Sequence, residues 1–76
     1  MTNKKVYIIR GSEDGNLGVA SNIKAAYRIA SEYLEDYEVV TTYSKVVAQL
    51  KMHSYVEVVA DASVYAEIET MFLVSK

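Results

Sequence analysis

The chain has 76 residues, of which 51% are hydrophobic and 24% charged, and its formal net charge is −2. This length fits one small domain with a thin core, spanning residues 1–76, and the apolar content is too high for an intrinsically disordered chain. Cysteine is absent, which excludes disulfides, thiolate metal sites and thiol nucleophiles. The longest basic run is Lys4-Lys5, so the cationic footprint of a nucleic-acid-binding protein is missing and no nucleic-acid partner is expected.

The N-terminal segment predicts a strand. Residues 4–10 are rich in β-branched and aromatic side chains, which strands favour. Because side chains alternate along a strand, Val6 and Ile8 are expected on one face. Tyr7 and Ile9 are then expected on the other face.

A turn and a second strand complete a predicted β-hairpin. The turn covers residues 11–16, where Asp14 and Gly15 tolerate the positive φ angles of tight turns. Residues 17–20 return as the second strand. The glycines of this segment form the pattern G-x-x-x-G-x-x-G, which lacks the lysine of a phosphate-binding loop, and Glu13 would repel phosphate. A hairpin turn is therefore the preferred interpretation.

An amphipathic helix is predicted over residues 22–35. Apolar residues recur there at steps of three and four, and charged residues occupy the other face. Ser21 or Asn22 can cap the helix by accepting a hydrogen bond from a backbone amide that has no partner within the helix.

A second helix is predicted to run to about His53. It follows a short extended stretch at residues 39–41, and Thr42 or Ser44 can cap it. His53 is the only histidine, and a cation at this helix end can satisfy the last carbonyls. A lone histidine without cysteine is a poor set of metal ligands, so neither a metal site nor a catalytic role is predicted for it.

The C-terminal third predicts a second hairpin. Residues 55–60 and 64–74 both alternate between two faces, and residues 61–63 form the turn. The resulting order is strand, strand, helix, helix, strand, strand. The simplest fold is an α+β domain in which a four-stranded antiparallel sheet carries both helices on one face. The pattern does not determine the order of strands in the sheet.

The sequence also bears on location. No stretch reaches the ~20 apolar residues of a membrane span, and the strand-like N-terminus has no apolar run of signal-peptide length. Small secreted domains usually need disulfides, so a cysteine-free chain favours a reducing compartment. We therefore expect a cytoplasmic protein that does not associate with membranes.

Glu57, Glu67 and Glu69 are expected in a row on the wet face of the second hairpin. Paired carboxylates can perform acid–base chemistry on glycosides. The solvent face of an antiparallel sheet has the same pattern, and so short a chain leaves little room for a cleft. A solvated face is the preferred interpretation, and no catalytic residue is assigned.

The seven tyrosines suggest a contact surface. Tyrosine packs at the edges of cores, and it also anchors protein interfaces. If both helices cover one face of the sheet, the other face stays open and partly apolar. The residues predicted to form a protein-binding surface there are Tyr7, Ile9, Tyr55, Tyr65 and Met71. Phe72 is a further candidate, although it shares a face with Ile68 and can belong to the core instead.

The segment K-V-Y-I-I-R-G-S-E-D-G at residues 5–15, followed by G-V-A-S-N at 18–22 and A-A-Y at 25–27, resembles the small accessory proteins of tailed bacteriophages. The likeness is one of style over the whole chain: short, cysteine-free, slightly acidic and α+β. It implies a role in host takeover or counter-defence, in which a small protein binds and blocks a host protein. It transfers no functional residues.

These observations favour a non-enzymatic protein-binding module without a cofactor, whose partner is a host protein or a second copy in a homodimer. The alternative is an oligomeric protein that binds or sequesters a small, nucleotide-like ligand, with polar contacts from the glycine-containing hairpin and from Arg10, Lys24 and Arg28. A third hypothesis is a hydrolase that uses Glu67 and Glu69.

Overall fold

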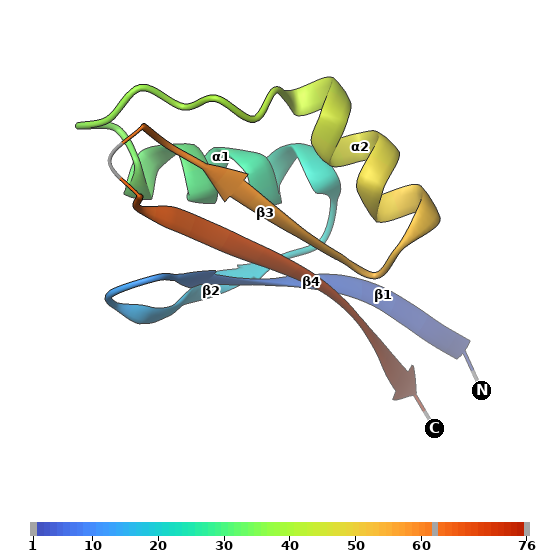
Figure 1. Cartoon of the computed structure of the whole chain (residues 1–76). Coiled ribbons are helices and arrows are strands. Elements are labelled where there is room, and N and C mark those ends of the chain that lie inside the picture. The colour runs from blue at the N-terminus through green and yellow to red at the C-terminus, as the bar shows by residue number, and fades with distance from the viewer. Residues whose placement is uncertain (1, 62, 76) are drawn as a thin grey trace.

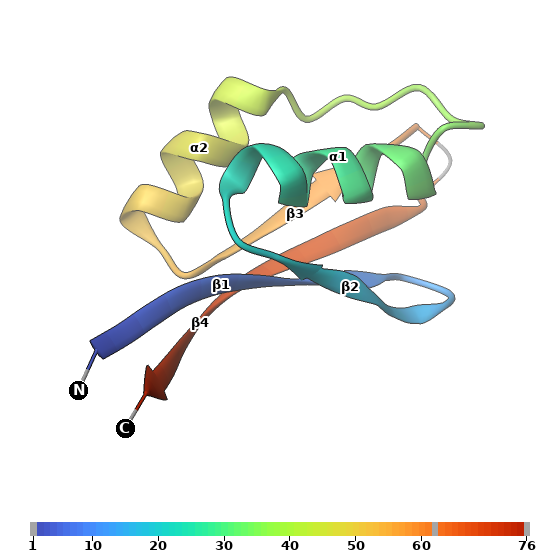
Figure 2. The same cartoon turned by 180° about the vertical axis from the view of Figure 1, so that it is seen from behind.

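The first and last strands of the chain pair at the centre of the sheet (Figure 1). The structure is a computed structural model that describes residues 2–61 and 63–75. The four strands form one antiparallel sheet in the order β2-β1-β4-β3, and α1 and α2 lie on the same side of it (Figures 1 and 2). The elements, in chain order, are β1 (Thr2–Gly11), β2 (Gly15–Ala20), α1 (Ile23–Tyr33), α2 (Tyr43–Met52), β3 (Tyr55–Val59) and β4 (Tyr65–Ser75). The predicted α+β fold, with its order of elements, is confirmed.

The two predicted hairpins join through β1 and β4. These strands are in register from Thr2 opposite Ser75 to Gly11 opposite Ala66. β2 and β3 are shorter and flank the central pair on its two sides. A lone hairpin is marginally stable in water, so each hairpin gains its stability from the other and from the helices.

Part of the central pair extends beyond the flanking strands. β2 ends at Ala20, opposite Tyr7, and β3 begins at Tyr55, opposite Glu69. Residues 2–6 of β1 and 71–75 of β4 therefore continue as a two-stranded ribbon, with both chain ends at its tip (Figure 2). This segment is called the ribbon below.

The hairpin turn between β1 and β2 is held by α1. The Tyr33 ring lies over Gly11, where a Cβ atom would be only 2.5 Å from the ring. The Tyr33 hydroxyl accepts a hydrogen bond from the Glu13 amide at 3.1 Å. Gly15 takes the turn at a φ of 75°, a conformation that glycine adopts without strain.

Side-chain caps start both helices. Asn22 Oδ1 accepts from the Ala25 amide at 2.8 Å, and Thr42 Oγ1 accepts from the Lys45 amide at 3.3 Å. Of the two cap candidates predicted for each helix, these are the ones that act. The first helix ends at Tyr33, two residues before its predicted end at residue 35.

The core fills the space between the sheet and the two helices. Its largest fully buried side chains come from both strands of the central pair, from β3, from α2 and from the C-cap of α1. They are Ile9, Leu34, Val46, Val58 and Ile68.

The face of β1 that the helices cover differs from the prediction. Tyr7 is 5% exposed and Ile9 is 0% exposed, and both belong to the core. Placing them on the uncovered face was wrong, because Val6 and Ile8 occupy that face. β1 is apolar on both faces, so alternation separates the two faces without showing which one is covered. Ile9 pairs with the fully buried Ile68, and this pairing shows that the row of Tyr7 and Ile9 faces the helices.

The assignment of β1 can be tested with two matched substitutions. Ile9→Ala should lower the free energy of unfolding by about 2–5 kcal/mol, because it leaves a cavity in the core. Ile8→Ala should cost roughly half as much or less, since Ile8 is only half-buried on the opposite face. Urea denaturation measures both. A larger loss for Ile8→Ala would reverse the assignment, and Ile9→Val offers a milder probe if Ile9→Ala does not fold.

Candidate functional site

The face of the sheet opposite the helices is not covered by any described element (Figures 1 and 2). It is called the open face below. Alternation and the strand registers assign its side chains. They are Lys4, Val6, Ile8, Arg10, Val19, Tyr55, Glu57, Val59, Tyr65, Glu67, Glu69, Met71 and Leu73.

A tyrosine and two carboxylates meet on the open face. Glu57 of β3 stands directly opposite Glu67 of β4, a placement in which like charges repel. The Tyr55 hydroxyl lies 2.5 Å from Glu67 Oε2 and 3.1 Å from Glu57 Oε2, so it can donate to either carboxylate. Glu57 and Glu67 are called the carboxylate pair below.

The contacts with the two carboxylates change the pKa of Tyr55. Desolvation, followed by the hydrogen bond with Glu67 and that with Glu57, raises the pKa of the Tyr55 hydroxyl above its ordinary value. The hydroxyl keeps its proton at neutral pH, as an ordinary tyrosine does, and acts as a donor. Its contribution to stability is fully present below the ordinary tyrosine pKa and is lost as the pH rises through the raised one.

The third carboxylate has a partner of its own. Arg10 Nη1 lies 2.9 Å from Glu69 Oε1, and both side chains are about two-fifths exposed, at 40% and 43%. Arg10 stands opposite Glu67 in the register but reaches diagonally to Glu69. Glu69 is therefore neutralised within the chain, whereas among the described residues Glu57 and Glu67 share the neutral hydroxyl of Tyr55.

Exposed apolar side chains share the open face with the carboxylates, Val59 next to them and Met71 and Leu73 farther along β4. Val59 is 40% exposed, Met71 39% and Leu73 48%. Val19 adds an exposed aliphatic group on β2, and Tyr55 is 41% exposed. Exposed apolar groups bordered by polar and charged groups are typical of surfaces that bind proteins.

The structure brings together some of the predicted contact residues and separates the others. Tyr55, Tyr65 and Met71 share the open face. Tyr7 and Ile9 lie in the core on the other side of the sheet. Ile8 and the Arg10–Glu69 pair were missed, although the alternation of β1 places Ile8 and Arg10 in one row. Val6 of the same row is only 6% exposed.

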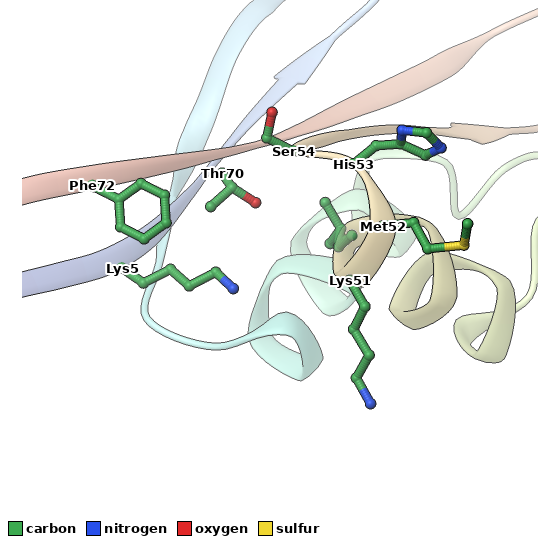
Figure 3. Close-up of a pocket in the computed structure, with 8 residues that line it drawn as sticks. Lys5, Lys51, Met52, His53, Ser54, Thr70 and Phe72 are labelled. Carbon is green, nitrogen blue, oxygen red and sulfur yellow. The ribbon is translucent and has the colours of Figure 1, made fainter.

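Phe72 belongs neither to the core nor to the open face. It points to the helix side of the sheet, as Ile68 does, but it lies on the ribbon and is 62% exposed. It borders an open depression of about 240 Å³ between the end of α2, the start of β3 and the ribbon (Figure 3). The lining residues are Lys5, Leu50, Lys51, Met52, His53, Ser54, Thr70 and Phe72.

The depression has polar and cationic groups at its margins. Figure 3 shows Lys5 beside Phe72 on the ribbon, while Lys51, Met52 and His53 extend away from them. Thr70 Oγ1 is buried without a hydrogen-bond partner among the described residues. The backbone amide of His53, rather than its exposed ring, caps α2 by donating to the Gln49 carbonyl at 2.7 Å.

The residues of the small-ligand alternative do not converge. Arg10 lies on the open face, whereas Lys24 and Arg28 lie on α1 beyond the other face of the sheet. Lys24 and Arg28 border a separate depression of about 310 Å³ with Tyr27 and Tyr43, whose rings meet edge to face at 5.5 Å. No single site therefore contains the hairpin and all three cations.

Residues 2–61 and 63–75 contain no group of three or more histidine, aspartate or glutamate side chains placed to hold a metal ion. In the same part of the chain, none of the helices has the length and apolar character needed to cross a membrane. No protein-family model, curated protein or solved structure matches the chain.

Replacing Tyr55 with Phe tests the carboxylate pair. Tyr55→Phe should lower the free energy of unfolding by at most about 1 kcal/mol, because it removes a solvent-exposed hydrogen bond. The loss should be smaller in a Glu57→Gln background, where the two carboxylates no longer repel each other. Urea denaturation of the four proteins completes the double-mutant cycle. Equal losses in the two backgrounds would show that the hydroxyl does not relieve the repulsion.

Proposed function

We propose that the protein is a non-enzymatic binding module that recognises a partner protein with the open face of its sheet. The observation that carries the proposal is that half-exposed apolar and aromatic side chains share one uncovered face of the sheet with the carboxylate pair. Tyrosine, methionine and branched aliphatic groups supply contact area, and the carboxylates supply orientation. A rigid sheet presents these groups without the entropic cost of ordering a loop.

The charges of the open face define the chemistry of the partner. Arg10 already neutralises Glu69, so Glu57 and Glu67 are the acidic groups left for an outside cation. A partner that places lysine or arginine over this pair, with apolar side chains toward Val59 and Met71, would complement the surface. Binding of this kind weakens as salt rises, because exposed charges are screened.

The resemblance to phage accessory proteins suggests where such binding would matter. A protein of that type acts in the host cytoplasm, where it inhibits or modulates a host protein. The cysteine-free composition suits that compartment. The proposed partner is therefore a host protein with a basic and apolar contact surface, and occupation of that surface by this chain is the proposed mechanism of inhibition.

Site-specific photo-crosslinking tests the proposed function. A photoreactive phenylalanine analogue at Val59 should crosslink to a partner protein in cells, because Val59 borders the carboxylate pair. The matched control carries the analogue at Arg28, whose exposed side chain lies on α1 on the opposite side of the molecule. Mass spectrometry identifies the products and separates crosslinks to another protein from crosslinks between copies of this chain.

The proposal predicts a defined product at Val59 that the control position does not give. Adding Glu57→Gln and Glu67→Gln should reduce its yield several-fold, since the partner's cation loses its counter-charge. The same product at both positions, or no product at Val59, would contradict recognition through the open face.

A further inference from the structure

The outer edge of β4 has no strand partner along the ribbon. β3 begins at Tyr55, opposite Glu69, and the Thr70 amide donates to the Ser54 carbonyl at 2.7 Å. Backbone groups alternate in direction along a strand, so the N–H and C=O of Phe72 point to the same side as those of Thr70. Beyond Ser54, none of the described residues pairs with this side of β4. The peptide groups of Phe72 therefore lie on an open edge.

Other sheet edges are protected against pairing with foreign strands. On β3, the Val59 carbonyl accepts from the Val40 amide at 2.8 Å, and the Val59 amide donates to Thr41 Oγ1 at 3.0 Å. On the ribbon, β1 carries Lys4 and Lys5, and lysine at a strand edge discourages pairing. β2 is short and adjoins a bulge in its pairing with β1. The ribbon segment of β4 carries no charge, and beyond Ser54 no described residue hydrogen-bonds to its outer edge.

This unprotected segment suits a second copy of itself. Residues 70–75 of β4 carry no charge, so two antiparallel copies meet no like-charge repulsion. Phe72 and Leu73 are 62% and 48% exposed, which leaves apolar groups on both sides of the strand to be covered. Antiparallel pairing of identical strands also satisfies the two-fold symmetry of most homodimers.

The shape of the ribbon fits the same arrangement. Pairing about a two-fold axis at Leu73 sets the Phe72 backbone opposite that of Val74 of the partner subunit. Each ribbon then fills the space beside the other, because β3 stops where the ribbon starts. The partner strand ends near Ser54, at the depression that Thr70 and Phe72 also line (Figure 3).

We infer that two copies of the protein associate by antiparallel pairing of their β4 edges at residues 71–75, which joins two four-stranded sheets into one. The pairing uses the ribbon edge, so it goes beyond the proposed function and leaves most of the open face free. Each dimer then presents two partner-binding surfaces, which increases the effective affinity for a multivalent partner.

Sedimentation equilibrium of the full chain tests the inference, from about 10 μM to about 1 mM, because small interfaces are weak. The wild type should shift from monomer to dimer across this range. Phe72→Lys places a charge on each paired edge and should raise the dissociation constant at least about tenfold. Val19→Lys is the matched control, since Val19 is 59% exposed on β2 and far from the ribbon, and it should dimerise as the wild type does.

Amide hydrogen exchange identifies the edge directly. The Phe72 amide should exchange quickly in the monomer and slow several-fold in the dimer, while the Leu73 amide, which points to β1, stays protected in both. A monomer at the highest concentration, equal dimerisation of Phe72→Lys and Val19→Lys, or a Phe72 amide unaffected by concentration would each overturn the inference. The crosslink from Val59 to another protein is scored separately, so either proposal can fail while the other stands.

Discussion

The antiparallel pairing of β1 with β4 is the constraint on which the rest of the structure depends. It joins residues from the two ends of the chain and places Ile9 beside Ile68, two of the largest fully buried side chains. Without it, the chain would consist of two hairpins and two short helices, none of which is stable alone in water. The pairing also sets which face of β1 the helices cover, and therefore which side chains remain on the open face.

The proposed surfaces follow from the lengths of the paired strands. β1 and β4 are longer than β2 and β3, so the ribbon extends beyond the helix-covered part of the sheet and has one open edge. Within the body, the register sets Glu57 opposite Glu67 and lets Arg10 reach Glu69. The open face thus has a charged group at its β3 side that the chain satisfies only in part. A face that recognises another protein and an edge that pairs with a second copy can coexist, because they lie on different parts of the sheet.

Local signals in the sequence were sufficient for the elements and the fold class. The Asp14-Gly15 turn, the helical periodicity and the alternation of the C-terminal strands predicted the order and the single helix-covered face. Alternation carries no information on which strands are neighbours, so the central position of β1 and β4 was not predictable. Alternation also could not show whether Tyr7 or Ile8 lies in the core, because both rows of β1 are apolar. The exposure of Phe72 depends on where α2 ends, and the Arg10–Glu69 pair depends on the register of β1 and β4. Both the helix end and the register are set only when the sheet assembles.

The central pairing is tested most directly by introducing pairs of cysteines, because the chain has no cysteine of its own. Lys5 and Phe72 are opposite each other and exposed, so cysteines at these two positions should form an intramolecular disulfide on mild oxidation. Cysteines at Lys4 and Phe72 point to opposite faces and should remain reduced under the same conditions. Mass spectrometry and non-reducing electrophoresis distinguish the intramolecular bond from a crosslink between copies. Efficient closure of the Lys5–Phe72 pair alone is the predicted result, whereas closure of the Lys4–Phe72 pair, or of neither, would contradict the register and the sheet built on it.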